Sequence, residues 1–481
     1  MSLQQRLQSN TNAPGGGSGG DNLPVPASII VAEPERATVD PFGELKSRVH
    51  HDVITRIGPR LFARAEAEGS SELAERVREA VDEAIAIDKT PLTRQERAQV
   101  AREIADDILG YGPLEPFLRD ETITEIMVNG SSNIYIERRG KIVETDAAFV
   151  DDQHLLRIID KIISRIGRRI DEASPMVDAR LPDGSRVNAI IPPLAVSGPT
   201  LTIRKFRKDP FKMEDLLRFG SLTPKCAQFL EACVRGKLNV LISGGTGSGK
   251  TTTLNVLSAA IPDDERIITV EDAAELQLRQ KHVITLESRP ANIEGKGLVQ
   301  IRDLVRNTLR MRPDRIVVGE VRGPEAVDML QAMNTGHDGS ITTIHANTPR
   351  DALSRVETLV LTAGVELPLK AIREQIASAI DLVVQVSRLV DGTRRITYVT
   401  EVLRMESDVV TMQDIFRAKP IEDDSEVPAS GSNRLLGPLQ CTGIIPGFID
   451  KLAGNGVHLP PQFFQTEQRA GGYGSFGRPA S

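Results

Sequence analysis

The stretch Val240-Leu-Ile-Ser-Gly-Gly-Thr-Gly-Ser-Gly-Lys-Thr-Thr-Thr253 decides the fold of this 481-residue chain. An apolar run ends in the pattern Gly-x-x-x-x-Gly-Lys-Thr at residues 244–251, and a run with helical character follows it. Phosphate oxygens are bound by several N–H groups that converge on one point, so the loop needs small residues. The stretch therefore predicts a strand, a phosphate-binding P-loop and a helix.

Two side chains of this loop have separate predicted roles. Lys250 is expected to reach the β- and γ-phosphates as a point charge, and the Thr251 hydroxyl is expected to bind Mg²⁺. The main-chain N–H groups of the loop would hold the remaining phosphate oxygens. The predicted nucleotide-binding set is Gly244, Gly245, Thr246, Gly247, Ser248, Gly249, Lys250, Thr251 and Thr252.

Composition narrows the class of protein. The chain is 40% hydrophobic and 26% charged, which is typical of a globular protein, and its length predicts two or three domains. A net charge of −7, with four Tyr and no Trp, weighs against nucleic-acid binding. Cys226, Cys233 and Cys441 lack disulfide or zinc spacing, so we expect buried thiols. No apolar run approaches the roughly 20 residues that cross a bilayer, which predicts a cytosolic protein.

The first half of the chain divides into three predicted segments. Residues 1–42 are poor in apolar residues, and we expect a disordered tail. Apolar residues at helical spacing and the capping-box pattern Thr93-x-x-Glu96 predict a helical bundle over 43–109. Mixed helix and strand patterns around the turn Asn129-Gly130 predict an α+β domain over 110–208.

The second half is predicted to hold the nucleotide. Over 209–420 strand and helix patterns alternate, which favours a parallel α/β core with its ligand at the carboxyl ends of the strands. The pattern loses definition after Val399. We expect 421–481 to be a C-terminal segment with an acidic, then Ser/Gly-rich loop and a Gly-rich tail.

Two apolar runs end in carboxylates that a P-loop enzyme would use. Glu271 follows the run at 266–270, and Glu320 follows the run at 315–319. Such residues hold Mg²⁺, in part through water, and orient the attacking water. Glu320 is the predicted general base or water-positioner because its preceding run is the more apolar. Glu271 is the predicted partner of Mg²⁺ and water.

Histidines and arginines supply further candidates. His337 and His345 flank an expected strand at 340–344, and no third ligand lies at zinc-like spacing. A role in sensing the γ-phosphate fits His345 better than His337. Arg180, Arg186 and Arg204 lie in or beside expected strands of the α+β domain, although most surface arginines have no specific role.

Six segments of the chain carry a resemblance to a known family: 180–186, 199–206, 244–251, 270–277, 312–322 and 335–349. Together they resemble the secretion ATPase superfamily, and more closely its CpaF branch, the motor of tight-adherence pili. The resemblance covers roughly residues 100–415. It implies an N-terminal PAS-like α+β domain and a RecA-like P-loop ATPase domain with nucleotide between them.

The resemblance assigns a role to each candidate residue. Glu271 matches the acid of the Asp box, and Glu320 matches the Walker B acid. His337 and His345 match the histidines of the His box. The remaining matches are arginines that complete the phosphate site: Arg186 and Arg204 from the N-terminal domain, with Arg310 and Arg312 from the ATPase domain.

The resemblance also implies an activity and a setting. The chain would form a homo-hexamer in the bacterial cytoplasm, peripheral to the inner membrane, and would hydrolyse ATP to ADP and phosphate with Mg²⁺. Rotation of N-terminal domains against the ATPase ring would act on an inner-membrane platform protein to extrude pilin, with retraction as an open second mode. Three dispersed cysteines cannot build the four-cysteine zinc insert of the type II secretion and type IVa relatives.

Two alternatives remain open from the residues alone. One is a RecA-like motor whose load is nucleic acid, against which the acidic charge balance argues. The other is a nucleotide-regulated assembly scaffold in which slow hydrolysis times the docking of partners. GTP is less favoured than ATP as the nucleotide because the chain lacks an Asn-Lys-x-Asp motif.

Overall fold

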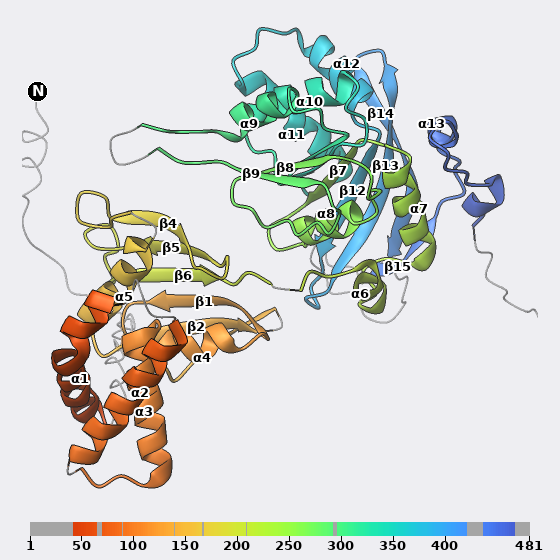
Figure 1. Cartoon of the computed structure of the whole chain (residues 1–481). Helices are drawn as coiled ribbons and strands as arrows, with labels where there is room; N and C mark the ends of the chain where they lie inside the picture. Colours follow the sequence, from red (N-terminus) through yellow and green to blue (C-terminus); the bar gives the residue numbers. More distant parts are fainter. Residues whose placement is uncertain are drawn as a thin grey trace, which may run out of the picture.

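The computed structural model describes residues 42–64, 70–88, 90–138, 140–165, 168–207, 209–291, 296–420 and 436–466. Outside these ranges lie three predictions: the N-terminal tail, apart from its last residue, the loop after residue 420, and the Gly-rich end of the chain. The described residues form a helical bundle, a six-stranded antiparallel sheet and a nine-stranded mixed sheet (Figure 1).

Three helices form the bundle, and their apolar faces meet in a small core. Leu45, Val53 and Val81 are among its fully buried residues. The predicted capping box is confirmed, because Thr93 Oγ1 accepts from the N–H of Glu96 while Thr93 N–H donates to the Glu96 carboxylate. The helices are α1 (Gly43–Arg64), α2 (Ser70–Ile87) and α3 (Arg94–Leu109).

The bundle is attached to the first sheet through the end of α3. Lys161 Nζ donates to the carbonyls of Ile108 at 2.9 Å and Gly110 at 2.7 Å. The last carbonyls of a helix have no partner within the helix, and they carry partial negative charge. One lysine therefore satisfies them while fixing the bundle to α5 (Asp152–Ser164).

The N-terminal domain is built on the antiparallel sheet, in the order β3-β2-β1-β6-β5-β4. Helix α5 buries Leu155, Ile159 and Ile162 against it. The predicted strands around Asn129-Gly130 are confirmed as β1 and β2. Its elements are η2 (Gly112–Leu114), α4 (Glu115–Arg119), β1 (Ile123–Asn129), β2 (Asn133–Arg138), β3 (Lys141–Glu144), α5 (Asp152–Ser164), β4 (Met176–Arg180), β5 (Arg186–Ile190) and β6 (Thr200–Arg204).

The C-terminal domain contains the predicted parallel core. Strands β12, β7, β11, β10, β8 and β9 lie side by side in that order, and all are parallel. One face buries residues of α7 and α8, and the other buries residues of α9 to α12 (Figure 1). These elements are α6 (Met213–Arg218), α7 (Pro224–Arg235), β7 (Val240–Gly244), α8 (Lys250–Ser258), β8 (Ile267–Glu271), β9 (Val283–Glu287), α9 (Ile301–Thr308), β10 (Arg315–Val318), α10 (Glu325–Asn334), β11 (Ile341–Ile344), α11 (Pro349–Thr362), α12 (Leu369–Ala379) and β12 (Leu382–Arg388).

The same sheet continues beyond β12 as an antiparallel extension that the sequence analysis did not resolve. It consists of β13 (Arg394–Glu406), β14 (Val409–Pro420) and β15 (Leu436–Cys441). The short elements α13 (Ile449–Gly454) and η3 (Pro461–Phe464) follow. The sheet is therefore mixed, with its antiparallel strands at one end.

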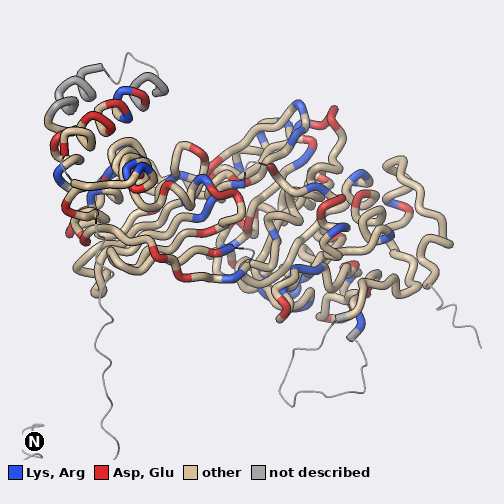
Figure 2. Tube along the Cα trace, turned by 90° about the horizontal axis from the view of Figure 1, so that it is seen from below, with Lys and Arg blue, Asp and Glu red and all other residues tan. Residues whose placement is uncertain are grey.

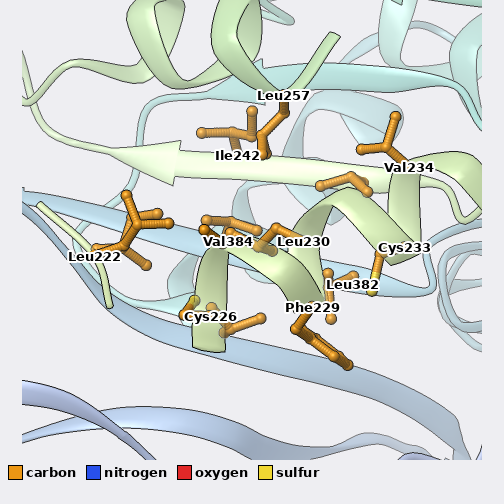
Figure 3. Packing of buried hydrophobic residues seen from close by; sticks show 14 of the residues in the cluster. Leu222, Cys226, Phe229, Leu230, Cys233, Val234, Ile242, Leu257, Leu382 and Val384 are labelled. Carbon is orange, nitrogen blue, oxygen red and sulfur yellow. The ribbon is translucent and has the colours of Figure 1, made fainter. Parts of the chain in front are cut away.

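An aromatic cluster packs η3 against α7. Phe229 is fully buried, and its ring lies 5.2 Å from that of Phe416 and 5.9 Å from that of Phe464, measured between centroids. Figure 3 shows Phe229 and the two cysteines of α7, Cys226 and Cys233, within this packing. The prediction of buried thiols is confirmed for these two, and burial raises the pKa of both.

None of the helices in the described ranges combines the length and the apolar composition that a membrane crossing requires.

Replacing Phe229 by alanine is expected to lower the free energy of unfolding by about 3–5 kcal/mol, because removal of the buried ring leaves an enclosed cavity. The matched change at Phe219, which is 49% exposed, is expected to cost less than about 1 kcal/mol. Urea denaturation followed by circular dichroism measures both. Equal losses in the two variants would contradict a central role for Phe229 in this packing.

Candidate active site

The P-loop joins β7 to α8 in a conformation that only glycine adopts easily. Gly247 and Gly249 have φ angles of +66° and +100°, which lie in the left-handed region. A Cβ on Gly244 would collide with the Ser248 hydroxyl and the carbonyl oxygen of Val386. The glycines are therefore required both by backbone angles and by the close approach of β12.

In this structure the loop satisfies its own polar groups. Ser248 Oγ and Lys250 Nζ both donate to the carbonyl of Gly245, at 2.9 and 3.1 Å. Burial lowers the pKa of Lys250, and Glu320 opposes that change while Arg322 and Arg204 add to it. The charges of these three residues thus all act on the pKa of Lys250.

Glu271 is placed at the end of β8 and is almost fully buried, with 3% exposure. One carboxylate oxygen, Oε2, accepts from the N–H groups of Glu275 and Leu276. The other oxygen, Oε1, is buried and has no hydrogen-bond partner among the described residues. Burial raises the pKa of Glu271 to about 7, because desolvation disfavours the charged form.

Glu320 follows β10 and is paired with an arginine. Arg322 Nη2 lies 2.5 Å from Glu320 Oε2, and Arg322 Nη1 lies 3.6 Å from an oxygen of Asp272. Because β8 and β10 are parallel neighbours, Glu271 and Glu320 emerge at the same edge of the sheet. His345 follows β11, which separates β10 from β7, so it emerges at this edge as well.

Three predicted residues lie at the opposite edge. His337 precedes β11, and its carbonyl accepts from Ser340 Oγ. Arg310 and Arg312 precede β10, in the loop after α9. Since the strands are parallel, their amino ends lie a full strand length from the P-loop. Within one subunit the structure does not bring these three residues to the phosphate loop.

The arginines of the N-terminal domain form a row across its sheet. Arg180 is the register partner of Arg186, and Arg186 is the register partner of Arg204. Register partners share a face of the sheet, so three positive charges lie side by side. Glu125 of β1 is the next register partner in the row, beside Arg204.

Two arginines of this row contact the C-terminal domain. Arg186 Nε lies 2.9 Å from Glu275 Oε1, and its Nη2 donates to the carbonyl of Ala273 at 2.9 Å. Arg180 Nη2 lies 2.8 Å from Glu287 Oε2. Arg186 therefore docks on the segment that directly follows Glu271, and Arg180 docks on Glu287, the register partner of Glu271 on β9.

A cavity of about 910 Å³ lies between the two domains. Arg180, Arg186 and Arg204 line its N-terminal side, and Asp272 and Arg322 line its C-terminal side. The cavity thus separates the row of arginines from Asp272, the residue that follows Glu271.

Sequence reasoning missed two further arginines, Arg388 and Arg394, which flank the turn between β12 and β13. Arg394 Nε donates to the carbonyl of Gly247 within the P-loop at 2.8 Å. The chain carries no motif for this contact, because it depends on β12 being the neighbour of β7.

The fold and this edge of the sheet define a P-loop nucleotide-binding protein, and comparisons with known proteins agree. A family model described as a type II/IV secretion system protein matches residues 107–423. A putative conjugal transfer protein of Mycobacterium tuberculosis is 36% identical over 330 residues, which cover 67% of this chain and 93% of that protein. Conjugal transfer protein TrbB of Rhizobium radiobacter is 35% identical over 315 residues, covering 64% and 92%.

Among solved structures, the crystal structure of the VirB11 ATPase from the Brucella suis type IV secretion system, in complex with sulphate, matches with a TM-score of 0.33. The identity is 31%, over 60% of this chain and 94% of that chain. On the family model and the relatives in sequence, the chain belongs to the type II/IV secretion ATPase family, and it is an ATPase.

The raised pKa of Glu271 predicts a pH-dependent stability. Its folded-state pKa of about 7 lies above the ordinary value of 4.5, so ionisation opposes folding as pH rises through this interval. Glu271→Gln cannot ionise. Relative to the parent, its free energy of unfolding is expected to improve by about 2 kcal/mol between pH 5 and pH 8.

Urea denaturation at the two pH values measures this difference. Asp272→Asn, a change at the exposed neighbouring acid, is the matched control and is expected to follow the parent. A Glu271→Gln variant whose difference from the parent does not change with pH would contradict a protonated, buried Glu271.

Proposed function

We propose that this ATPase is the hexameric motor of a tight-adherence type IV pilus, with a RecA-like ATPase domain and a PAS-like N-terminal domain. The observation that carries the proposal is the row of N-terminal arginines docked beside Glu271. An arginine that reaches a phosphate site from a second domain makes chemistry depend on the position of that domain.

ATP with Mg²⁺ fits the residues at the carboxyl edge of the sheet. The glycines of the P-loop leave room for phosphate oxygens, and Lys250 brings a positive charge to them. The Thr251 hydroxyl would bind Mg²⁺ directly, while Glu271 and Glu320 would hold it in part through water. The unpartnered Oε1 of Glu271 supports this role, because a buried acceptor without a donor is costly.

Hydrolysis needs a base and a means of stabilising charge. The ion supplies electrostatic stabilisation of the phosphate oxygens when it is bound. Glu320 would orient the attacking water and accept its proton, and His345 would sense the γ-phosphate from the end of β11. Arg186 and Arg204 would neutralise the charge that develops on the transferred phosphoryl group.

His337, Arg310 and Arg312 need a different explanation, because they lie at the edge opposite the P-loop. In a ring, subunits meet through two different surfaces, so one subunit's loops can approach its neighbour's ligand. We assign these three residues to the nucleotide site of an adjacent subunit. The homo-hexamer is therefore part of the proposal.

The load is proposed to be an inner-membrane platform protein at the base of a pilus, with the motor in the bacterial cytoplasm. Domain rotation driven by ATP would extrude pilin, with retraction as an open second mode. The chain's family membership and its resemblance to the CpaF branch support this load.

The names of the relatives favour a second candidate, a motor of conjugal transfer. Direct contact with DNA is disfavoured by the net charge of −7. Figure 2 also shows basic and acidic residues interspersed over both sheet domains. Turnover that DNA stimulates with a steep salt dependence would favour a nucleic-acid load over a pilus.

Two variants are expected to fail in different ways. Lys250→Ala should lose nucleotide binding, because the loop then lacks the ammonium that is expected to reach the β- and γ-phosphates. Glu320→Gln should keep ATP bound but lower its hydrolysis by about a hundredfold or more. Equilibrium binding of fluorescent ATP and phosphate release measure the two properties.

The same variants test the biological role. Neither should restore pili to a strain that lacks the chain, whereas the parent should restore them. Pili restored by Glu320→Gln would support the scaffold alternative instead. Hydrolysis at the parental rate in Glu320→Gln would remove Glu320 from its role.

The interdomain arginines are tested by Arg204→Ala. This change is expected to lower kcat by about a hundredfold, because the lost charge acts on the transition state, while nucleotide affinity changes only a few-fold. Arg138→Ala, on β2 and paired with Asp120, is a matched control and should hydrolyse ATP at the parental rate. An equal loss in both variants would point to a general defect of the N-terminal domain.

A further inference from the structure

The hairpin between β12 and β13 runs along the P-loop. β12 pairs in parallel with β7 as far as Val386, which lies opposite Gly244 at the end of β7. The hairpin therefore continues where the loop begins. Arg388 and Arg394 are register partners across the hairpin, so both lie on the same face of it.

Both arginines reach the glycine backbone of the loop. Arg394 Nε donates to the carbonyl of Gly247 at 2.8 Å, and its Cδ lies 3.5 Å from the position that a Cβ on Gly249 would take. Arg388 Nη1 lies 3.6 Å from the equivalent position on Gly247. Two guanidinium groups thus stand beside the segment that would cradle phosphate.

Arg388 has a second contact, which joins the two domains. Its Nη2 donates to the carbonyl of Gly140 at 2.9 Å, just before β3 of the N-terminal domain. Arg180, Arg186 and the carbonyl of Arg207 contact the C-terminal domain on the side of Glu271 and β9. Arg388 therefore joins the N-terminal domain to the opposite side of the site, at the P-loop itself.

Among the residues that the structure describes, no carboxylate neutralises the charge on these arginines. Neither Arg388 nor Arg394 forms an ion pair with a carboxylate within the described part of the chain, and their acceptors are neutral carbonyls. A phosphate oxygen is a stronger acceptor than a carbonyl, since its hydrogen bond to a guanidinium is charge-assisted. A bound nucleotide would therefore compete with Gly140 for Arg388.

We propose that Arg388 is a nucleotide-binding and positioning residue that links occupancy of the P-loop to the N-terminal domain. Its Nη2 holds the β2–β3 turn through the carbonyl of Gly140. Phosphate in the loop draws the guanidinium away, and the turn is released. The inference rests on nucleotide binding at the P-loop, which is one element of the proposed function.

Nucleotide affinity gives the first test. Arg388→Ala is expected to weaken binding of fluorescent ADP about tenfold, because a charge-assisted hydrogen bond is lost. Arg388→Lys keeps the charge but loses the paired N–H donors of the guanidinium, so its affinity for ADP should lie between those of Arg388→Ala and the parent. Arg404→Ala removes an exposed arginine from the same β13 strand and should bind as the parent does.

Hydrogen–deuterium exchange of a peptide spanning 133–144 gives the second test, which does not depend on activity. In the parent, ADP should speed exchange in this peptide, because the anchor at Gly140 is given up. In Arg388→Ala, exchange should already be fast without ADP, and ADP should change it little.

Either of two results would overturn the inference: Arg388→Ala binding ADP with parental affinity, or exchange in the parent peptide that ADP leaves unchanged. These failures are distinct from failure of the proposed function. A parent that binds and hydrolyses nucleotide but assembles no pilus leaves Arg388 in its role, whereas a parent that binds no nucleotide removes both proposals.

Discussion

The close approach of β12 to the P-loop is the constraint on which the rest of the site depends. Gly244 lies between the Ser248 hydroxyl and the carbonyl of Val386, in a space that no Cβ could occupy. Parallel pairing of β7 with β12 on one side and β11 on the other fixes where the loop begins. Every other group acts at the loop only because the order of the strands brings it to the same edge, as in other parallel sheets.

The interface between the domains is shaped by a row of arginines and by the glutamates that compensate their charge. Three arginines in register across β4, β5 and β6 repel one another, and that arrangement persists because acidic groups of the other domain face it. Glu287 and Glu275 supply this compensation to Arg180 and Arg186. Because these pairs lie beside the segment after Glu271, any movement of the N-terminal domain changes the electrostatic environment of the buried carboxyl. The position of the N-terminal domain is thereby linked to the ionisation of Glu271 through charge.

The sequence predicted the P-loop, the capping box and the parallel strands, since each of these is encoded in a short run of residues. Glu271 and Glu320 were placed correctly at strand ends for the same reason. The order of strands is not local information. The residues favoured His345 over His337 as a sensor of the γ-phosphate. Only the strand order shows that β11 lies between β10 and β7, which brings His345 to the P-loop edge and leaves His337 at the opposite edge. Arg394 was missed on the same ground, because its contact with Gly247 requires β12 to be the neighbour of β7.

Several polar contacts around the P-loop are ones that a nucleotide would have to replace. Lys250 and Ser248 donate to the carbonyl of Gly245, Arg394 donates to that of Gly247, and Glu320 is paired with Arg322. Lys250 and Arg394 donate to carbonyl oxygens, which are weaker acceptors than phosphate oxygens. Arg322 is paired with Glu320, a carboxylate that an Mg²⁺ ion would also attract. Binding therefore exchanges one set of polar contacts for another instead of filling a site prepared in advance, and such an exchange moves the segments to which the displaced partners belong. A P-loop that binds by exchange would suit a motor, because the free energy of binding could then move the segments whose contacts are replaced.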